Sequence, residues 1–170
     1  MKVTDLFDLT GKTAIITGGG RGLGAQIATG FAEAGANVVL CSRKKEACDE
    51  VASQIEKLGV KALSFKCDIT NPSDVQEVVN ETYREFGAID ILVNNSGASW
   101  GAPAVDMPLE AWQKVMNVNV TGTFIMSQTT GRVMIEQGHG KIINIASVAG
   151  LGGTDPRVLD TVGYNASKGA

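Results

Sequence analysis

The sequence has a single histidine and only three cysteines, and this scarcity excludes several kinds of catalytic site. His139 stands between two glycines before a predicted strand, and no second histidine exists to complete a metal site or a histidine-based triad. Cys41, Cys48 and Cys67 form no CxxC pair, so we expect buried, reduced thiols that pack as small apolar residues. We therefore expect a reaction that uses neither a metal ion nor a histidine base.

Neither sign of charge dominates the sequence. It holds 15 Lys and Arg against 18 Asp and Glu, which gives a formal net charge of −3. Proteins that bind nucleic acid or acidic membranes usually carry a basic patch or stripe. We therefore expect neither nucleic acid nor a membrane among the partners.

Long hydrophobic runs are also absent. A transmembrane helix needs about 20 mainly apolar residues, and the apolar stretches at 89–93 and 142–146 are far shorter. The first nine residues contain no apolar core of signal-peptide length. We expect a soluble, cytoplasmic protein, and 170 residues suit one domain that spans 1–170.

What the sequence does contain is an alternation of short β-branched runs with helical patterns. This alternation is typical of an α/β fold, in which a parallel sheet has helices on both faces. Strands are predicted where nearly continuous apolar runs occur, at 13–17, 37–41, 62–66, 89–94 and 141–145. Helical spacing of apolar residues predicts helices near 47–58 and 75–86, the second capped by Asn71, and a longer helical stretch from Leu109 to Gln137 that Gly122 and Gly131 interrupt.

A glycine-rich loop directly follows the first predicted strand. Its sequence is Gly18-Gly19-Gly20-Arg21-Gly22-Leu23-Gly24, and a helical pattern begins immediately after it. Glycines let the backbone approach a pyrophosphate closely, and amide hydrogens at the start of the helix can bind the phosphate charge. The strand and helix on either side favour dinucleotide binding over a merely structural turn.

The end of the second predicted strand bears on the choice of cofactor. An acidic residue there would accept hydrogen bonds from the adenosine ribose and repel a 2′-phosphate, but this chain has Ser42. Arg43 follows, and Arg21 lies in the glycine loop, so two guanidinium groups could bind a 2′-phosphate. NADP(H) is therefore favoured over NAD(H). The alternative is that Arg43, Lys44 and Lys45 form a solvated helix start.

Tyr164 and Lys168 lie four positions apart near the end of the chain. On a helix this spacing puts both side chains on one face, where the ammonium can stabilise a phenolate. Ionising a phenol near neutral pH requires roughly 4 kcal/mol, which one cation at about 4 Å supplies in an effective dielectric constant of about 20. The pair predicts proton transfer beside a bound nucleotide.

These motifs, in this order, resemble those of the short-chain dehydrogenase/reductase family. The likeness runs from about Thr10 to the last residue, with Thr17–Gly24 similar to TGxxxGxG and 94–97 similar to NNAG, although Ser96 replaces the usual alanine. The resemblance implies four catalytic residues, namely Asn119, Ser147, Tyr164 and Lys168. With the arguments above it implies cofactor contacts from Gly18, Gly20, Arg21, Gly22, Leu23, Gly24, Ser42, Arg43, Asp68, Ile69, Asn95, Gly97, Tyr164 and Lys168.

The family also assigns roles to these residues. Lys168 would hold the nicotinamide ribose, and Asn119 would support a water chain; only the family motif decides between Asn119 and Asn117. Ser147 follows a predicted strand at its carboxyl end, where sheets of this kind bind ligands, so it can donate a hydrogen bond to the substrate oxygen.

The expected fold is a Rossmann-type doubly wound parallel sheet with strand order 3-2-1-4-5. The expected function is an NADP(H)-dependent oxidoreductase that interconverts a ketone and a secondary alcohol of small-molecule size. The resemblance is nearest to bacterial 3-oxoacyl carrier-protein reductases, slightly favoured, and to gluconate-type sugar dehydrogenases. The alternative is a dinucleotide-binding fragment or regulatory module without turnover. Self-association as a dimer or tetramer is expected if the chain is full length.

Two departures from the family pattern concern the end of the chain. Family members continue beyond Lys168 through two more strands and a substrate lid, so we expect these parts to be absent and the sequence to be a fragment. Ser147 and Tyr164 are 17 positions apart, more than is common in the family. The extra residues fall within 152–160, with a turn expected at Asp155-Pro156, and we expect this loop to border the substrate mouth.

Overall fold

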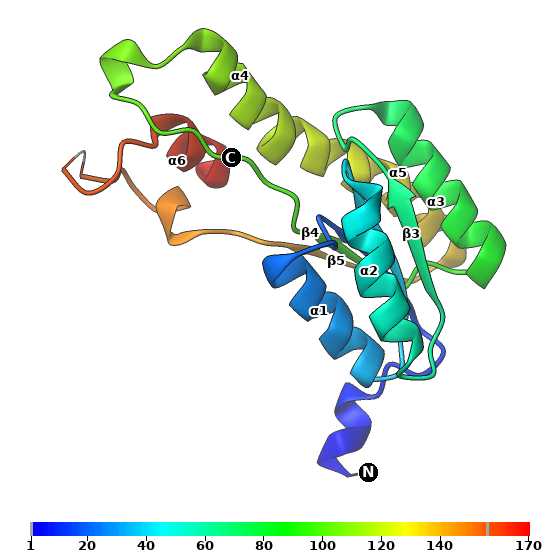
Figure 1. Ribbon diagram of the computed structural model, residues 1–170. Helices are drawn as coiled ribbons and strands as arrows, with labels where there is room; N and C mark the ends of the chain where they lie inside the picture. Colours follow the sequence, from blue (N-terminus) through cyan, green and yellow to red (C-terminus); the bar gives the residue numbers. More distant parts are fainter. Residues whose placement is uncertain (1, 156) are drawn as a thin grey trace.

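The computed structural model describes residues 2–155 and 157–170 and contains one five-stranded sheet (Figure 1). The strands are β1 (Thr13–Thr17), β2 (Asn37–Ser42), β3 (Ala62–Lys66), β4 (Ile91–Asn94) and β5 (Lys141–Asn144). Their order is β3-β2-β1-β4-β5 and each neighbouring pair is parallel. The predicted α/β fold and strand order are confirmed.

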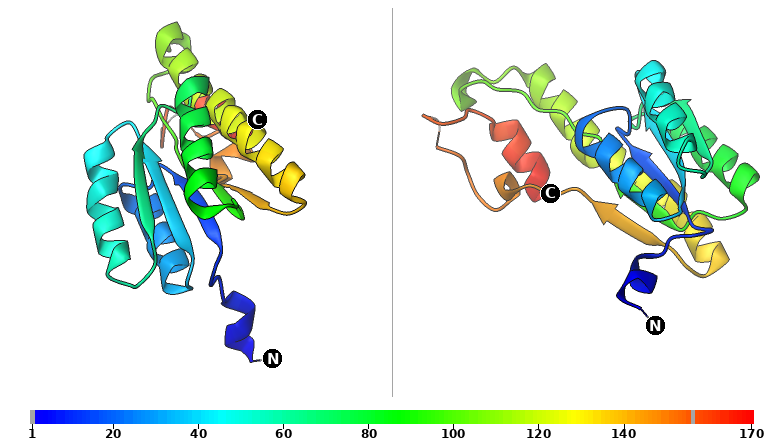
Figure 2. Two further views of the ribbon diagram at one scale, coloured as in Figure 1. Left: turned by 90° about the vertical axis from the view of Figure 1, so that its right-hand side faces the viewer. Right: turned by 60° about the horizontal axis from the view of Figure 1, so that its bottom comes forward.

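The helices cover both faces of this sheet. They are α1 (Gly22–Glu33), α2 (Lys45–Glu56), α3 (Pro72–Phe86), α4 (Leu109–Met116), α5 (Thr123–Gln137) and α6 (Val162–Gly169). Side chains of β1 alternate between two cores, with Ala14 and Ile16 facing α1 and α2 while Ile15 faces α3 and α5. The left view of Figure 2 shows these helix pairs on opposite sides of the sheet.

The long helical stretch expected from Leu109 to Gln137 is divided into two helices. A π-helical turn, Asn117–Gly122, joins α4 to α5, and such turns often occur at functional sites. Gly122 is needed there, because a Cβ atom on it would lie 2.7 Å from the side chain of Ile69. Gly131, the other expected interruption, lies inside α5 without breaking it.

Two predicted strands are shorter than expected. The strand expected at 89–94 begins only at Ile91, because the backbone of Ile89 is bonded to the side chain of Gln137 on both its N–H and its carbonyl. The strand expected at 141–145 ends at Asn144, and it forms one edge of the sheet. Ile142 and Ile143 of this edge are 40% and 41% exposed, so β5 presents apolar surface.

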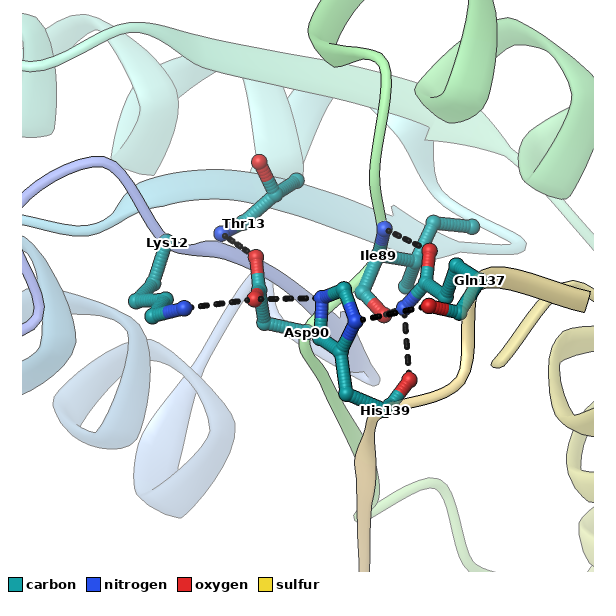
Figure 3. Close-up of polar contacts among 6 residues, drawn as sticks. All are labelled: Lys12, Thr13, Ile89, Asp90, Gln137 and His139. Carbon is teal, nitrogen blue, oxygen red and sulfur yellow. Dashed lines mark hydrogen bonds and ion pairs between the residues drawn. The ribbon is translucent and has the colours of Figure 1, made fainter. Parts of the chain in front are cut away.

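A buried carboxylate joins the amino-terminal ends of the strands (Figure 3). The Asp90 carboxylate accepts hydrogen bonds from the Thr13 amide at 2.9 Å and from Lys12 Nζ at 3.0 Å. His139 Nε2 lies 3.3 Å from the same carboxylate, and Gln137 links the backbones of Ile89 and His139. This cluster lies at the end of the sheet opposite the glycine loop.

The described residues bear on two of the expectations drawn from scarcity. Cys41, Cys48 and Cys67 are free and buried, as expected. No helix in the described part of the chain combines the length and the apolar character that crossing a membrane requires.

Candidate active site

The glycine loop forms the floor of a cleft at the carboxyl edge of the sheet. Gly18 and Gly22 have φ angles of +65° and +53°, which side chains rarely tolerate, and the Gly18 amide donates to the carbonyl of Cys41 at 2.8 Å. The loop thus turns sharply from β1 into α1 while remaining attached to the end of β2.

The cleft has a volume of about 710 Å³. Every residue expected to touch the cofactor lines it, with the exceptions of Tyr164 and Lys168 on α6. Residues that sequence reasoning did not assign to this site also line it, and they are Lys44, Ala47, Cys67, Ser96 and Val118. Three of these five residues, Lys44, Cys67 and Ser96, stand next to the expected residues Arg43, Asp68 and Asn95, so adjacency in sequence could have identified them.

The packing of the glycines fits a dinucleotide. A Cβ atom on Gly24 would collide with the carbonyl oxygen of Gly18, and one on Gly20 would lie 2.9 Å from the backbone of Ala47. Side chains at these positions would therefore push the loop away from its neighbours. Arg21 precedes α1 and makes no side-chain capping bond in the described structure, so the first amides of α1 stay available for an anion.

Two basic side chains flank the part of the cleft at the end of β2. The Ser42 hydroxyl donates to the carbonyl of Lys44 at 2.8 Å and accepts from its amide at 3.2 Å, which fixes the turn that carries Arg43. Arg43 and Lys44 are exposed at the cleft, whereas Lys45 binds Asp49 on its own helix. The alternative that these basic residues only form a solvated helix start thus fits Lys45 better than Arg43.

Asp68 also lines this cleft, and its own side chain is held in the carboxylate form. The amide and the hydroxyl of Thr70 donate to it at 3.0 and 2.7 Å, and with the charge of nearby Arg43 they lower the pKa of Asp68 below its ordinary value. In the family pattern that this sequence resembles, the acid at this position contacts the adenine. An ionised carboxylate accepts hydrogen bonds, which is what contact with an adenine amino group requires.

The loop after β4 is tied to the end of β1. The Thr17 hydroxyl oxygen accepts from the amides of Asn95 and Ser96, both at 2.9 Å, and Asn95 Nδ2 donates to the Thr17 carbonyl at 3.0 Å. This bonding holds Asn95 and Gly97 in the wall of the cleft.

Asn119 lies in the π-helical turn and is buried. Its side-chain oxygen accepts from the Ala98 amide at 2.7 Å, and its Nδ2 donates to the Ala98 carbonyl at 2.9 Å and to Ser167 Oγ at 2.8 Å. The side chain therefore connects the loop after β4 to α6, which carries Tyr164 and Lys168. The family's water chain at this asparagine stays a prediction.

Tyr164 and Lys168 lie one turn apart on α6, beside α4 (Figure 1). Lys168 Nζ lies over the Tyr164 ring at 5.8 Å from its centroid, within the range of a cation–π contact. The same ammonium donates a 2.6 Å hydrogen bond to the carbonyl of Ile145, just beyond β5. The two side chains thus share one face of α6, and the ammonium is bonded to the backbone next to β5. Stabilisation of a phenolate by this ammonium stays a prediction.

Ser147 follows β5 and begins the 3-10 turn Val148–Gly150. Its hydroxyl oxygen accepts from the Ala149 amide at 3.2 Å. Gly150 lies against the end of α6, where a Cβ atom would collide with the carbonyl of Lys168. The turn that holds Ser147 therefore packs directly on the helix of Tyr164 and Lys168.

The loop between this turn and α6 is bonded to other parts of the chain at its described residues. Asp155 begins a bonded turn with Arg157, but the turn expected at Asp155-Pro156 falls partly outside the described residues. The Ala102 amide donates to the Asp160 carbonyl at 2.9 Å, which connects this loop to the segment after β4.

Comparison with known proteins agrees with this geometry. The family model described as short chain dehydrogenase matches residues 12–170. The gluconate 5-dehydrogenase of Gluconobacter oxydans is 40% identical over 148 residues, which are 87% of this chain and 58% of that protein. The crystal structure of a short-chain type dehydrogenase/reductase from Mycobacterium marinum has a TM-score of 0.95 and 41% identity, covering 99% of this chain and 66% of that one.

A second solved structure, an NAD⁺-bound xylitol dehydrogenase, has a TM-score of 0.90 and 36% identity, covering 95% of this chain and 61% of that one. The chain thus spans about 60% of the length of the relatives it matches. The extent of the family match and the likeness of both sequence and fold lead to one conclusion: this chain belongs to the short-chain dehydrogenase family.

Proposed function

We propose that this protein is an NADP(H)-dependent oxidoreductase that interconverts a ketone and a secondary alcohol. The observation that carries the proposal is the Lys168 ammonium, 5.8 Å from the centre of the Tyr164 ring, on a helix that packs against the Ser147 turn. Few other functions require a phenol, an ammonium and a hydroxyl together beside a dinucleotide cleft.

The cleft residues and Lys168 on α6 would each bind a different part of the cofactor. The glycine loop would hold the pyrophosphate, Asp68 with Ile69 the adenine, and Lys168 the nicotinamide ribose. When bound, the cofactor supplies the hydride for reduction of the ketone and accepts it in oxidation of the alcohol. Asn95 and Gly97, which also line the cleft, would contact the cofactor as well.

The chain's own side chains handle the proton. During reduction the substrate oxygen gains negative charge, and the Tyr164 hydroxyl donates a proton to it. The Lys168 ammonium stabilises the phenolate that remains, and the Ser147 hydroxyl donates a hydrogen bond to the same substrate oxygen. Asn119 acts at one remove, by holding α6 in place through its bond to Ser167.

The preference for NADP(H) rests on Arg43 and Arg21, which line the cleft where Ser42 stands in place of an acid. A 2′-phosphate would find two guanidinium groups there and no carboxylate in position 42 to repel it. Because one structural relative is an NAD⁺-bound xylitol dehydrogenase, this preference needs a direct test with both cofactors.

The substrate proposed is a small carbonyl compound or its alcohol. The names of gluconate 5-dehydrogenase and xylitol dehydrogenase direct attention to polyhydroxy ketones. The resemblance drawn from the sequence motifs adds a 3-oxoacyl thioester as a second candidate. We also propose a cytoplasmic dimer or tetramer whose contacts include the exposed side chains Leu109, Phe124 and Ile135 of α4 and α5.

The proposal is tested by adding the full-length protein to NADPH and a panel of these ketones and following absorbance at the nicotinamide band. We expect consumption of NADPH with at least one ketone and slower consumption of NADH. Binding of NADPH, measured by its fluorescence, without turnover of any ketone would favour the alternative of a dinucleotide-binding module.

A further inference from the structure

We infer that Asn165, between the two catalytic residues of α6, is a positioning residue that directs the hydroxyl of Ser147. The Asn165 side chain lies on α6 but is bonded to the turn after β5. Its Nδ2 donates to the Ala149 carbonyl at 3.0 Å, to the Gly152 carbonyl at 3.0 Å and to Thr154 Oγ1 at 2.8 Å. The inference rests on the function proposed above.

The orientation of this amide is set from the opposite side. The buried Thr161 hydroxyl donates to Asn165 Oδ1 at 3.1 Å, and the Asn165 backbone amide donates to the Thr161 carbonyl at 2.9 Å. Because backbone carbonyls only accept hydrogen bonds, the nitrogen of the amide must face Ala149 and Gly152. The two hydrogens of Nδ2 serve three acceptors, so the turn is gathered around one side chain.

Ala149 connects this amide to the catalytic serine. Its carbonyl accepts from Asn165 Nδ2, while its amide donates to Ser147 Oγ at 3.2 Å. These two groups belong to the peptides on either side of the Ala149 Cα atom, so a shift of this residue would change the direction from which its amide approaches the serine oxygen. Gly150, which lies against the carbonyl of Lys168, leaves no room for the turn to move toward α6.

The bond from Ala149 bears on where the Ser147 hydroxyl can donate its hydrogen. A hydroxyl group has one hydrogen to donate and two lone pairs that accept. Because one lone pair is occupied by the Ala149 amide, the hydroxyl hydrogen is left to point elsewhere, toward a substrate oxygen. By holding Ala149 in place, Asn165 thus favours a Ser147 hydroxyl that can donate to a substrate oxygen with developing negative charge.

The described contacts of the Asn165 side chain lie away from the cofactor cleft. It stands on the α6 face that looks toward the loop 148–161, and none of its side-chain bonds reaches the cofactor cleft. Loss of this side chain should therefore affect the handling of the substrate oxygen and leave the cofactor in place.

The test is a double-mutant cycle in the full-length protein with the variants Asn165→Ala, Ser147→Ala and both together. We expect Asn165→Ala to lower kcat about 10- to 100-fold, the effect of a small misplacement of a catalytic group, with no change in the affinity for NADPH. In the Ser147→Ala background the same substitution should have almost no further effect, because the group through which it acts is gone.

Equal effects in the two backgrounds would overturn the inference, and so would a comparable loss of NADPH affinity. Asn80→Ala, the same substitution on the exposed face of α3, should change neither quantity. If Asn165→Ala does not fold, Asn165→Asp keeps the shape and the acceptor for Thr161 but loses the donor, and the same two results decide.

Amide hydrogen exchange separates this inference from the proposed function, because it needs no turnover. Asn165→Ala should speed exchange at the Ala149 amide and leave the amides of β1 and β4 unchanged. If the wild-type protein reduces no ketone but this exchange effect appears, the proposed function fails while the tie between Asn165 and the Ser147 turn stands. Unchanged exchange at Ala149 in an active enzyme would refute the tie alone.

Discussion

At the scale of single residues, we expect the basic side chains of the cleft to decide between NADP(H) and NAD(H). Replacing Ser42 with Asp and Arg43 with Asn removes a cation and places a carboxylate where the 2′-phosphate would lie. Loss of charged hydrogen bonds worth about 1.5–3 kcal/mol should lower the ratio of kcat/KM for NADPH to that for NADH by about 10- to 100-fold.

Lys45→Asn is the matched control, because Lys45 is the first residue of α2, close to Arg43 in the chain, but binds Asp49 and does not line the cleft. Steady-state kinetics with both cofactors should show no change of ratio in this control. An unchanged ratio in the Ser42 and Arg43 double variant would contradict the proposed preference.

Asp90 predicts how stability depends on pH. Burial of its carboxylate, 9% exposed, opposes ionisation, but the Thr13 amide, the Lys12 ammonium and the nearby His139 together leave the pKa of Asp90 below its ordinary value. A carboxylate with a lowered folded-state pKa stabilises the protein above its unfolded-state pKa of about 3.9, and this stabilisation disappears as the pH falls through the folded-state value.

Asp90→Asn should therefore lower the free energy of unfolding at pH 7 by about 1–3 kcal/mol, and the difference from wild type should shrink in acid. Urea unfolding at pH 7 and below pH 4 measures it. Asp155→Asn is the control: Asp155 also has a lowered pKa, from its hydrogen bonds with Arg157, but it lies exposed on a loop, so the midpoint should not move. A constant difference across the pH range would refute the role of Asp90.

At this scale the sequence predicts the place of a residue when the residues next to it in the chain form a recognisable motif. Gly18 was expected in the cleft because it directly follows a strand and begins the glycine loop, whereas Asp68 and Asn95 were expected because they match the family motifs. The bonding of Asn165 could not be predicted in this way. It depends on how the loop 148–161 returns to α6, which no local pattern of residues specifies.

At the scale of elements, the π-helical turn between α4 and α5 makes a sharp prediction. Gly122→Ala would place a methyl group 2.7 Å from Ile69, whose side chain lines the cofactor cleft. We expect a loss of about 1–3 kcal/mol in the free energy of unfolding, together with weaker NADPH binding.

Gly131→Ala is the matched control in α5. A Cβ atom there meets no other part of the described structure within 4 Å, so alanine should stabilise the helix by about 0.5–1 kcal/mol. Thermal unfolding and NADPH titration of both variants measure these effects. If Gly122→Ala were as stable as Gly131→Ala, the tight contact with Ile69 would not constrain the turn.

These two glycines also show where prediction of elements stops. Both were expected to interrupt the helical stretch, since glycine is a poor helix former, but only Gly122 lies in an irregular turn. The difference lies in what packs against each residue in the folded chain. The strands were predicted more closely, because β1 and β2 are buried on both faces and their apolar runs are continuous.

At the scale of the whole molecule, the two ends of the sheet have separate tasks. The carboxyl edge holds the cleft, α6 and the Ser147 turn, while the amino edge is fastened by Asp90 (Figures 1 and 3). The fold and the cofactor cleft could be predicted from sequence, since both follow from the order of strands and the loops directly after them. The substrate could not, because the loops expected to border its site follow paths that depend on tertiary contacts.

The whole account depends on Tyr164 as the proton donor, and one substitution tests it most directly. Tyr164→Phe removes only the hydroxyl group and keeps the ring under the Lys168 ammonium. The account predicts that kcat for ketone reduction by the full-length protein falls about 10²- to 10⁴-fold while the dissociation constant for NADPH stays unchanged. A phenylalanine variant that keeps most of the wild-type kcat would contradict it.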